Sequence, residues 1–175
     1  MQEEELIIYD VKNGNKEKFG ELVEKYQNSL FTFIFYSVKD EGTAKDLLQE
    51  TFIKALKEIN NYTEEGKFKA WLWTIARNKV MDFYRKSSKI VPLEEDTIKQ
   101  DDETSKDALG KIELKHIQNL IDELPKEQKE VILMRQYLSF KEIASVLDCP
   151  LGTVLARLNR AIKKIQKSLG EDYAA

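Results

Sequence analysis

Histidine and cysteine are nearly absent from this chain, which limits the chemistry it can perform. Among its 175 residues there is one histidine, His116, and one cysteine, Cys149. A single residue of each kind excludes a disulfide framework, multi-cysteine zinc sites and multi-histidine metal sites. We expect His116 to be structural and Cys149 to act as a small hydrophobic residue in a turn. The sequence therefore predicts no metal, no cofactor and no catalytic residue.

Glycine, proline and long apolar runs are also scarce. The chain has 7 glycines and 3 prolines, which favours long helices over a turn-rich β architecture. No stretch approaches the roughly 18 uninterrupted apolar residues of a membrane span. The first residues, Met-Gln-Glu-Glu-Glu, are acidic where a secretory signal carries positive charge. The sequence predicts an all-α, cytoplasmic protein without membrane insertion.

Charge is distributed in blocks, although the net charge is only −3 and the pI is near 5.4. Residues 67–89 carry a net charge of +6 and residues 151–169 a net charge of +5, whereas residues 94–107 between them carry −5. Each basic block alone is compatible with a solvated helix face. Two such blocks in separate helical modules favour two contacts with a polyanion.

We expect two small helical domains joined by an acidic flexible linker. The predicted boundaries are 1–88 for an N-terminal helical bundle, 89–107 for the linker and 108–175 for a C-terminal domain. The linker has no sustained 3.6-residue apolar period, so it buries too little apolar area to offset the entropy of ordering it. Both domains have apolar residues at helical spacing.

Capping residues indicate where the helices of the first domain begin. We expect Asn15 to cap the second helix and Thr43, with Asp46 three residues later, to cap the third. A fourth helix is predicted over residues 68–86. Several large aromatic residues are expected to face inwards, among them Phe31, Phe33, Phe35, Tyr36 and Phe83.

Aromatic, amide and cationic side chains lie together at the start of the fourth predicted helix. Trp71 and Trp73 follow an Asn-rich loop, residues 60–66, and have lysines beside them. Rings that stack on base faces, amides that read base edges and cations that hold phosphates are what a protein uses to bind unstacked bases. Both tryptophans can equally be core anchors, or serve both purposes.

The C-terminal domain has the pattern of a helix-turn-helix motif. Ser139 and Glu142 form a capping box, Ala144 allows close helix approach, and Thr153 is expected to cap the last helix. The inner face of that helix is predicted to consist of Val154, Leu158, Ala161, Ile162, Ile165 and Leu169. Its outward face carries Arg157, Arg160, Lys164 and Lys167. A cationic face on the second helix is what docking in the major groove of DNA requires.

Several long motifs in a fixed order resemble the extracytoplasmic-function (ECF) sigma factors, the small two-domain members of the bacterial sigma-70 family. In the first half they are residues 19–27 (FGELVEKYQ), 44–55 (AKDLLQETFIKA) and 68–86 (FKAWLWTIARNKVMDFYRK). In the second half they are residues 124–132 (LPKEQKEVI), Glu142-Ile-Ala, Gly152-Thr-Val, Arg157-Leu and Arg160-Ala. The resemblance covers nearly the whole chain.

The resemblance implies three groups of binding residues and no enzymatic activity. The group that would bind the β′ clamp helices of core RNA polymerase is Asp46, Leu47, Leu48, Gln49, Glu50, Phe52 and Lys54. The group that would capture and open the minus-10 promoter element is Asn60, Asn61, Tyr62, Lys69, Trp71, Trp73, Arg77, Asn78 and Lys79. The group that would read the minus-35 element is Thr153, Arg157, Arg160 and Lys164. The polymerase β flap, promoter DNA and an anti-sigma factor are the other implied partners.

Three positions depart from the family pattern. Leu155 and Ala156 stand where the family usually has a basic residue and then Ser, so two polar contacts to the duplex are missing. Asp148 replaces the usual turn glycine, and Asp tolerates the left-handed conformation. A conventional helix-turn-helix regulator that binds DNA without polymerase is the main alternative, ahead of an enzyme or a purely protein-binding module.

Overall fold

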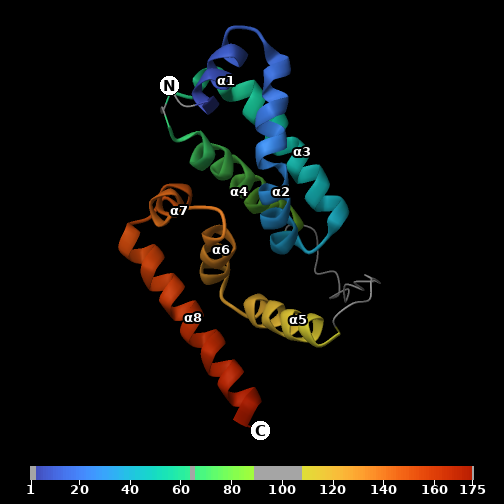
Figure 1. Ribbon diagram of the computed structural model, residues 1–175, viewed down its shortest axis with the longest axis vertical. Coiled ribbons are helices and arrows are strands. Elements are labelled where there is room, and N and C mark those ends of the chain that lie inside the picture. The colour runs from blue at the N-terminus through green and yellow to red at the C-terminus, as the bar shows by residue number, and fades with distance from the viewer. Residues whose placement is uncertain (1–2, 64–65, 89–107, 175) are drawn as a thin grey trace. The chain divides into compact units, whose positions relative to one another are not determined.

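The computed structural model describes residues 3–63, 66–88 and 108–174 (Figure 1), with side chains of the C-terminal part described from 115 to 170. The chain divides into two compact units, residues 1–96 and 97–175. All regular structure in the described ranges is helical, which confirms the predicted all-α class. None of these described helices is long and apolar enough to cross a bilayer. The predicted linker, 89–107, lies outside the described residues.

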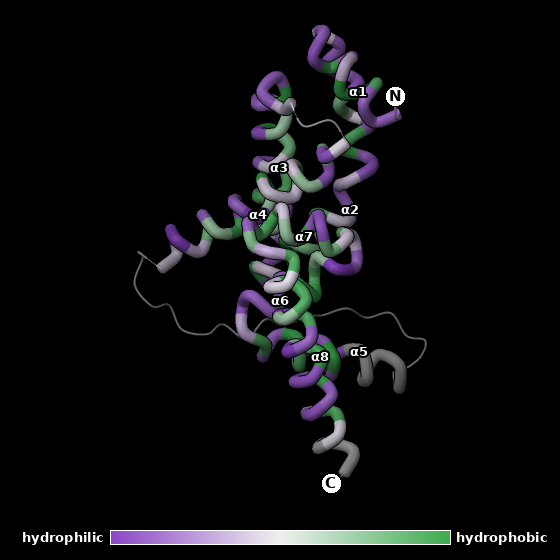
Figure 2. The backbone as a smooth tube through the Cα atoms, turned by 90° about the vertical axis from the view of Figure 1, so that its left-hand side faces the viewer, coloured by the Kyte–Doolittle hydropathy of each residue, from purple (hydrophilic) through white to green (hydrophobic). Residues whose placement is uncertain are grey.

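Unit 1 is a bundle of four α-helices. They are α1 (Glu3–Lys12), α2 (Phe19–Val38), α3 (Glu41–Glu58) and α4 (Phe68–Ser87), with short 3₁₀ helices at Lys16–Lys18 and Ile59–Asn61. Helices α2, α3 and α4 pack against one another, and α1 packs on α2. The largest fully buried side chains of this bundle are Trp73, Phe33, Phe68, Leu22, Leu30, Ile34 and Leu72. Green and purple segments alternate along these helices because each has one apolar face (Figure 2).

Two helix starts in unit 1 differ from the prediction. Asp40, not Thr43, caps α3: its carboxylate accepts a 2.7 Å hydrogen bond from the Thr43 backbone N–H. This hydrogen bond lowers the pKa of Asp40. Asn15 makes no side-chain cap, and its backbone N–H donates to the Asp10 carbonyl in the turn that ends α1.

Some predicted core residues of unit 1 lie near the surface instead. Of the aromatic residues at the end of α2 only Phe33 is buried, since Phe31, Phe35 and Tyr36 lie on the other sides of the helix. Phe83 is half-buried as well.

Unit 2 contains the helix-turn-helix motif. Its helices are α5 (Ala108–Asp122), α6 (Lys126–Arg135), α7 (Phe140–Leu147) and α8 (Leu151–Ala174), and α5, α6 and α7 each pack on α8. The capping box of Ser139 and Glu142 is confirmed, and Asp148 adopts the left-handed conformation with φ 48°. Thr153 is not a cap: its N–H donates to the Pro150 carbonyl, so α8 begins at Leu151.

Candidate polymerase and nucleic-acid interfaces

Helix α3 divides the residues expected to bind polymerase between two faces. Leu47 and Phe52 are buried in the bundle, so their main role is to hold α3 in place. The side chains of Asp46, Gln49 and Glu50 are exposed, while Leu48 and Lys54 are half-buried. We call Asp46, Gln49, Glu50 and Lys54 the polar strip. The strip therefore lies on a helix whose opposite side is fixed by core packing.

A groove of about 300 Å³ lies beside the polar strip. It is lined by Val23 and Gln27 of α2 and by Lys45, Leu48, Gln49, Phe52 and Ile53 of α3. Ile53 is 46% exposed and lies at this groove, so it adds apolar surface beside the polar strip. The sequence prediction missed Ile53, although its place seven residues after Asp46 and four after Gln49 puts it on the same helix face.

The Asn-rich loop of unit 1 is held against the start of α4 by Tyr62. Asn60 and Asn61 are exposed, whereas Tyr62 is only 6% exposed. The Tyr62 ring lies 5.6 Å from that of Phe68 and 5.3 Å from that of Trp71, and its hydroxyl accepts a hydrogen bond from the Lys67 N–H. In this structure Tyr62 therefore anchors the loop to α4.

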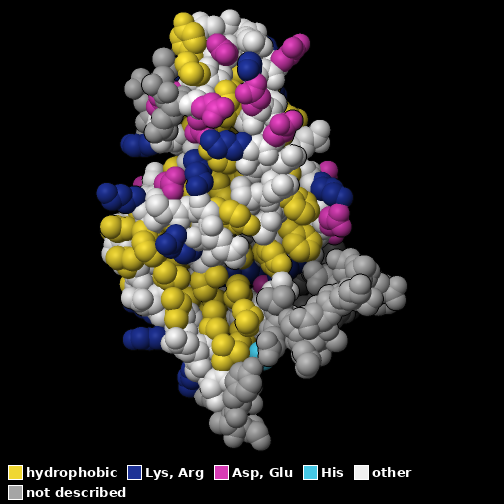
Figure 3. All heavy atoms as spheres, in the orientation of Figure 1, with side chains coloured by type: hydrophobic (Ala, Val, Ile, Leu, Met, Phe, Trp, Pro, Cys, Tyr) yellow, Lys and Arg dark blue, Asp and Glu magenta, His cyan; other side chains and the backbone are white. Residues whose placement is uncertain are grey.

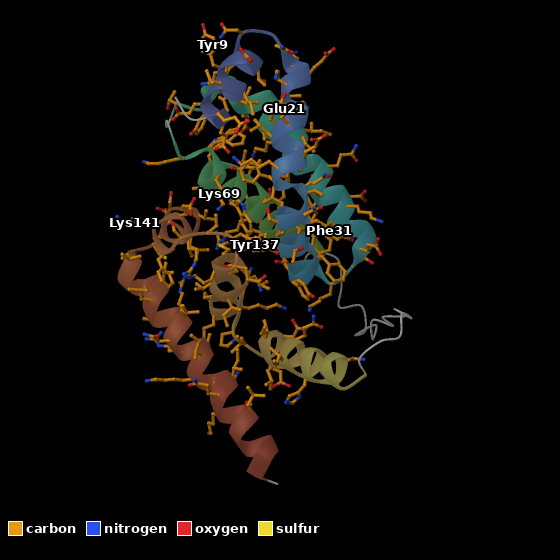
Figure 4. All side chains as sticks on the ribbon, in the orientation of Figure 1. Tyr9, Glu21, Phe31, Lys69, Tyr137 and Lys141 are labelled. Atoms are coloured by element: carbon orange, nitrogen blue, oxygen red, sulfur yellow. The ribbon has the colours of Figure 1, made fainter. Side chains whose placement is uncertain are left out.

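Trp71 and Trp73 have different environments. Trp73 is fully buried, with its ring 5.2 Å from that of Phe33. It is therefore a core anchor, one of the two roles that the sequence left open for the tryptophans. Trp71 is half-buried, and it shares one side of α4 with the exposed Asn78 two turns later. Lys69, on the first turn of α4, is also half-buried (Figure 4).

Lys79 lies on a different side of α4 from Trp71. Its Nζ is 2.8 Å from Oε2 of Glu50 on α3, and its side chain is 25% exposed. A residue expected to bind DNA is therefore paired with one expected to bind polymerase. This ion pair links the polar strip to α4.

The cationic residues of α8 lie on its outer side. Arg160, Lys164 and Lys167 are exposed and Arg157 is half-buried, while Val154 and Ala161 face the core. Lys164 donates a 3.0 Å hydrogen bond to the backbone carbonyl of Glu123, just after α5. Ile162 is 41% exposed, so its predicted place on the inner face is wrong. Figure 3 shows cationic side chains projecting along α8 beside apolar ones.

Both units match known protein families. Residues 22–90 match the family model described as Sigma-70 region 2, and residues 114–165 match the one described as Sigma-70, region 4. The class of protein is therefore a sigma-70 type factor with two domains.

Comparison with individual proteins narrows the family. The RNA polymerase sigma-H factor of Pseudomonas aeruginosa is 30% identical, over 96% of this chain and 94% of its own length. The ECF RNA polymerase sigma factor SigW of Bacillus subtilis is 30% identical over 93% of this chain and 94% of its own length. The sigma factor RpoE of Bartonella quintana, solved in complex with the anti-sigma factor NepR, is 25% identical with a TM-score of 0.70, covering 88% of this chain and 98% of RpoE. The chain belongs to the ECF RNA polymerase sigma factors.

Proposed function

We propose that this protein directs core RNA polymerase to particular promoters, with unit 1 contacting polymerase and the minus-10 element and unit 2 reading the minus-35 element. The observation that carries this proposal is that α3 displays a polar strip and an apolar groove that the core of unit 1 does not use. A helix-turn-helix regulator that dimerises also needs an exposed apolar surface, and binding to duplex DNA without polymerase distinguishes the two. The protein itself would catalyse no reaction; polymerase would supply the chemistry.

The groove and the polar strip would form the polymerase contact. Ile53, together with Leu48 on the groove wall, offers apolar surface beside the exposed Asp46 and Glu50. A patch with an apolar centre and a charged rim is typical of a protein–protein interface. We infer that the β′ clamp helices occupy it.

The start of α4 and the Asn-rich loop would hold the melted strand of the minus-10 element. Asn60, Asn61 and Asn78 supply amides, and the half-buried Trp71 supplies a ring face. Stacking on such a ring favours an unstacked base over one in the duplex. Trp73 and Tyr62 would support this surface from beneath.

The outer face of α8 would read the minus-35 element in the major groove. Thr153, Arg157 and Arg160 lie on its first three turns and Lys164 follows one turn later. Each domain alone is expected to bind DNA weakly, and binding both to one polymerase raises their effective concentration at the promoter. An anti-sigma factor is the second partner we infer, supported by the complex of RpoE with NepR.

The test is promoter-specific transcription with purified bacterial core RNA polymerase that lacks any other sigma factor. We expect the full chain to produce discrete start sites on a genomic template library. Asp46→Arg and Ile53→Asp should abolish them and weaken polymerase binding, whereas Glu24→Arg, which makes the same charge change at an exposed position of α2, should not. Discrete starts that survive Asp46→Arg and Ile53→Asp would contradict the polymerase contact. Tight binding to duplex DNA without polymerase would favour the conventional regulator.

A further inference from the structure

One row of exposed side chains along α8 is apolar at the start of the helix and cationic towards its end. Residues at four-residue spacing lie about 40° apart around a helix, so they form a continuous row. The members of this row are Leu151, Leu155, Asn159, Lys163 and Lys167, all of them exposed. Leu151 is 41% and Leu155 39% exposed. The row therefore begins with two apolar side chains, continues with an amide and ends with two cations.

The core of unit 2 does not account for the two leucines. The inner side of α8 is formed by Val154 and Ala161, both fully buried, and the leucines lie on the outside. No acidic residue occurs between 151 and 169, and the row that begins with the two leucines ends in two cations, Lys163 and Lys167. The chemistry of this row therefore matches a polyanion that also presents apolar groups. Duplex DNA is such a partner, because each thymine projects a C5-methyl group into the major groove.

We propose that Leu151 and Leu155 contact thymine methyl groups, and that Asn159 binds an adenine edge, in the duplex element on which α8 docks. This inference rests on the proposed function and adds the base preference that the missing polar contacts at 155 and 156 left open. Four residues of helix advance by about 6 Å, so leucines one turn apart are spaced widely enough to reach different base pairs. Two leucines on thymine methyl groups and an Asn amide one turn further would select an A·T-rich element. An Asn side chain can make two hydrogen bonds to N6 and N7 of adenine.

The methyl contact can be tested by removing the methyl group from the DNA. Deoxyuridine differs from thymidine in the major groove only by that group. A template with a randomised minus-35 region is first selected for initiation by the reconstituted polymerase containing the full chain, and thymidines of the selected element are then replaced one at a time by deoxyuridine. Loss of one buried methyl should lower initiation about fourfold, on the basis of roughly 0.8 kcal/mol per buried apolar carbon.

Variants assign the contact to its residue. We expect Leu155→Ala to lower initiation on the thymidine template about as much as deoxyuridine lowers it with the unchanged protein. With this variant, deoxyuridine in place of the thymidine that Leu155 contacts should cause no further fall. Ile162→Ala is the matched control, because Ile162 is equally exposed but lies almost two turns further along α8. Its response to deoxyuridine should equal that of the unchanged protein. Asn159→Ala should lower initiation roughly tenfold and make it insensitive to 7-deazaadenine at one position.

The outcomes separate this inference from the proposed function. Site-selective initiation that is unaffected by every deoxyuridine, or a Leu155→Ala variant that stays fully sensitive to it, overturns the apolar readout alone. If Leu155→Ala instead weakens binding to polymerase itself, the leucines belong to a protein interface and the inference is again wrong. If no template gives a discrete start, both the proposed function and this inference are wrong.

Discussion

Replacing Gly152 with alanine should stabilise unit 2 and at the same time weaken promoter recognition. Gly152 lies in the first turn of α8 with an ordinary helical φ, and a Cβ built on it meets no atom within 4 Å. The folded chain therefore gives no packing reason for a glycine there. Gly→Ala at such a position restricts the unfolded chain and adds about 0.4–1 kcal/mol to the free energy of unfolding.

The same methyl group projects from the outer side of α8, beside Ala156. If this face lies against base edges, the extra carbon holds the helix away from the groove and costs the equivalent of one base contact, about 1–3 kcal/mol. That corresponds to a fall in minus-35-dependent initiation of roughly fivefold to more than a hundredfold. Initiation from a template without a minus-35 element should change little.

Two probes measure the stability change in the full-length protein. Both tryptophans lie in unit 1, so their fluorescence follows that unit, whereas far-UV circular dichroism follows both. We expect Gly152→Ala to raise the urea midpoint of the second unit and leave the tryptophan transition unchanged. A lower midpoint would mean that the added methyl group clashes with its neighbours, which would contradict this reasoning. A higher midpoint with unchanged promoter selectivity would refute the close approach of α8 to DNA.

Two further predictions concern unit 1. Trp73→Ala removes a fully buried ring and should cost about 3–5 kcal/mol of unfolding free energy, measured by circular dichroism in urea, whereas Trp71→Ala should cost less and mainly reduce minus-10 opening, followed by 2-aminopurine fluorescence in the template. Equal destabilisation by the two changes would contradict their assigned environments. The pKa of Asp40 is lowered by the Thr43 N–H, so the stabilisation it provides is present above its ordinary value of 3.8 and is lost as the pH falls through the lower folded value. Asp40→Asn keeps an acceptor oxygen but no charge, and its urea midpoint, followed by tryptophan fluorescence, should depend less on pH between about 5 and 3; an unchanged pH dependence would contradict the cap.

Helical periodicity in the sequence was enough to predict the fold class and the helix-turn-helix. It did not locate the helix starts, because Asp40 and Thr43 are both good caps only three residues apart. Which of them is the cap depends on where the left-handed Lys39 ends α2, a feature of the turn as a whole. At Ser139 only one residue could cap with Glu142 as its partner, and there the prediction is confirmed.

The helical period of the sequence could predict some features of the unit 1 site but not others. Trp73 shares one side of α4 with Ala76 and Val80, both buried, so its place in the core could have been read from the 3.6-residue period. The interaction of Lys79 with Glu50 could not, because it depends on how α4 crosses α3. Ile53 was missed because an isolated apolar residue on a polar face is normal on protein surfaces, and only the neighbouring groove makes it noteworthy.

The ion pairs of unit 1 balance part of its positive charge. In residues 67–89, Arg85 is paired at 2.5 Å with Asp82, the one acid already counted in the +6. Lys79 is paired at 2.8 Å with Glu50 of α3, an acid outside this block, which leaves about +5. Residues 151–169 also carry +5, with no acid among them. Each phosphate contact that releases a counterion contributes a slope of about −0.9 to the logarithmic salt dependence of binding to duplex DNA. Both units should therefore contribute to the salt dependence of promoter binding, and stacking and hydrogen bonding should add a part that does not depend on salt to the capture of the melted strand by unit 1.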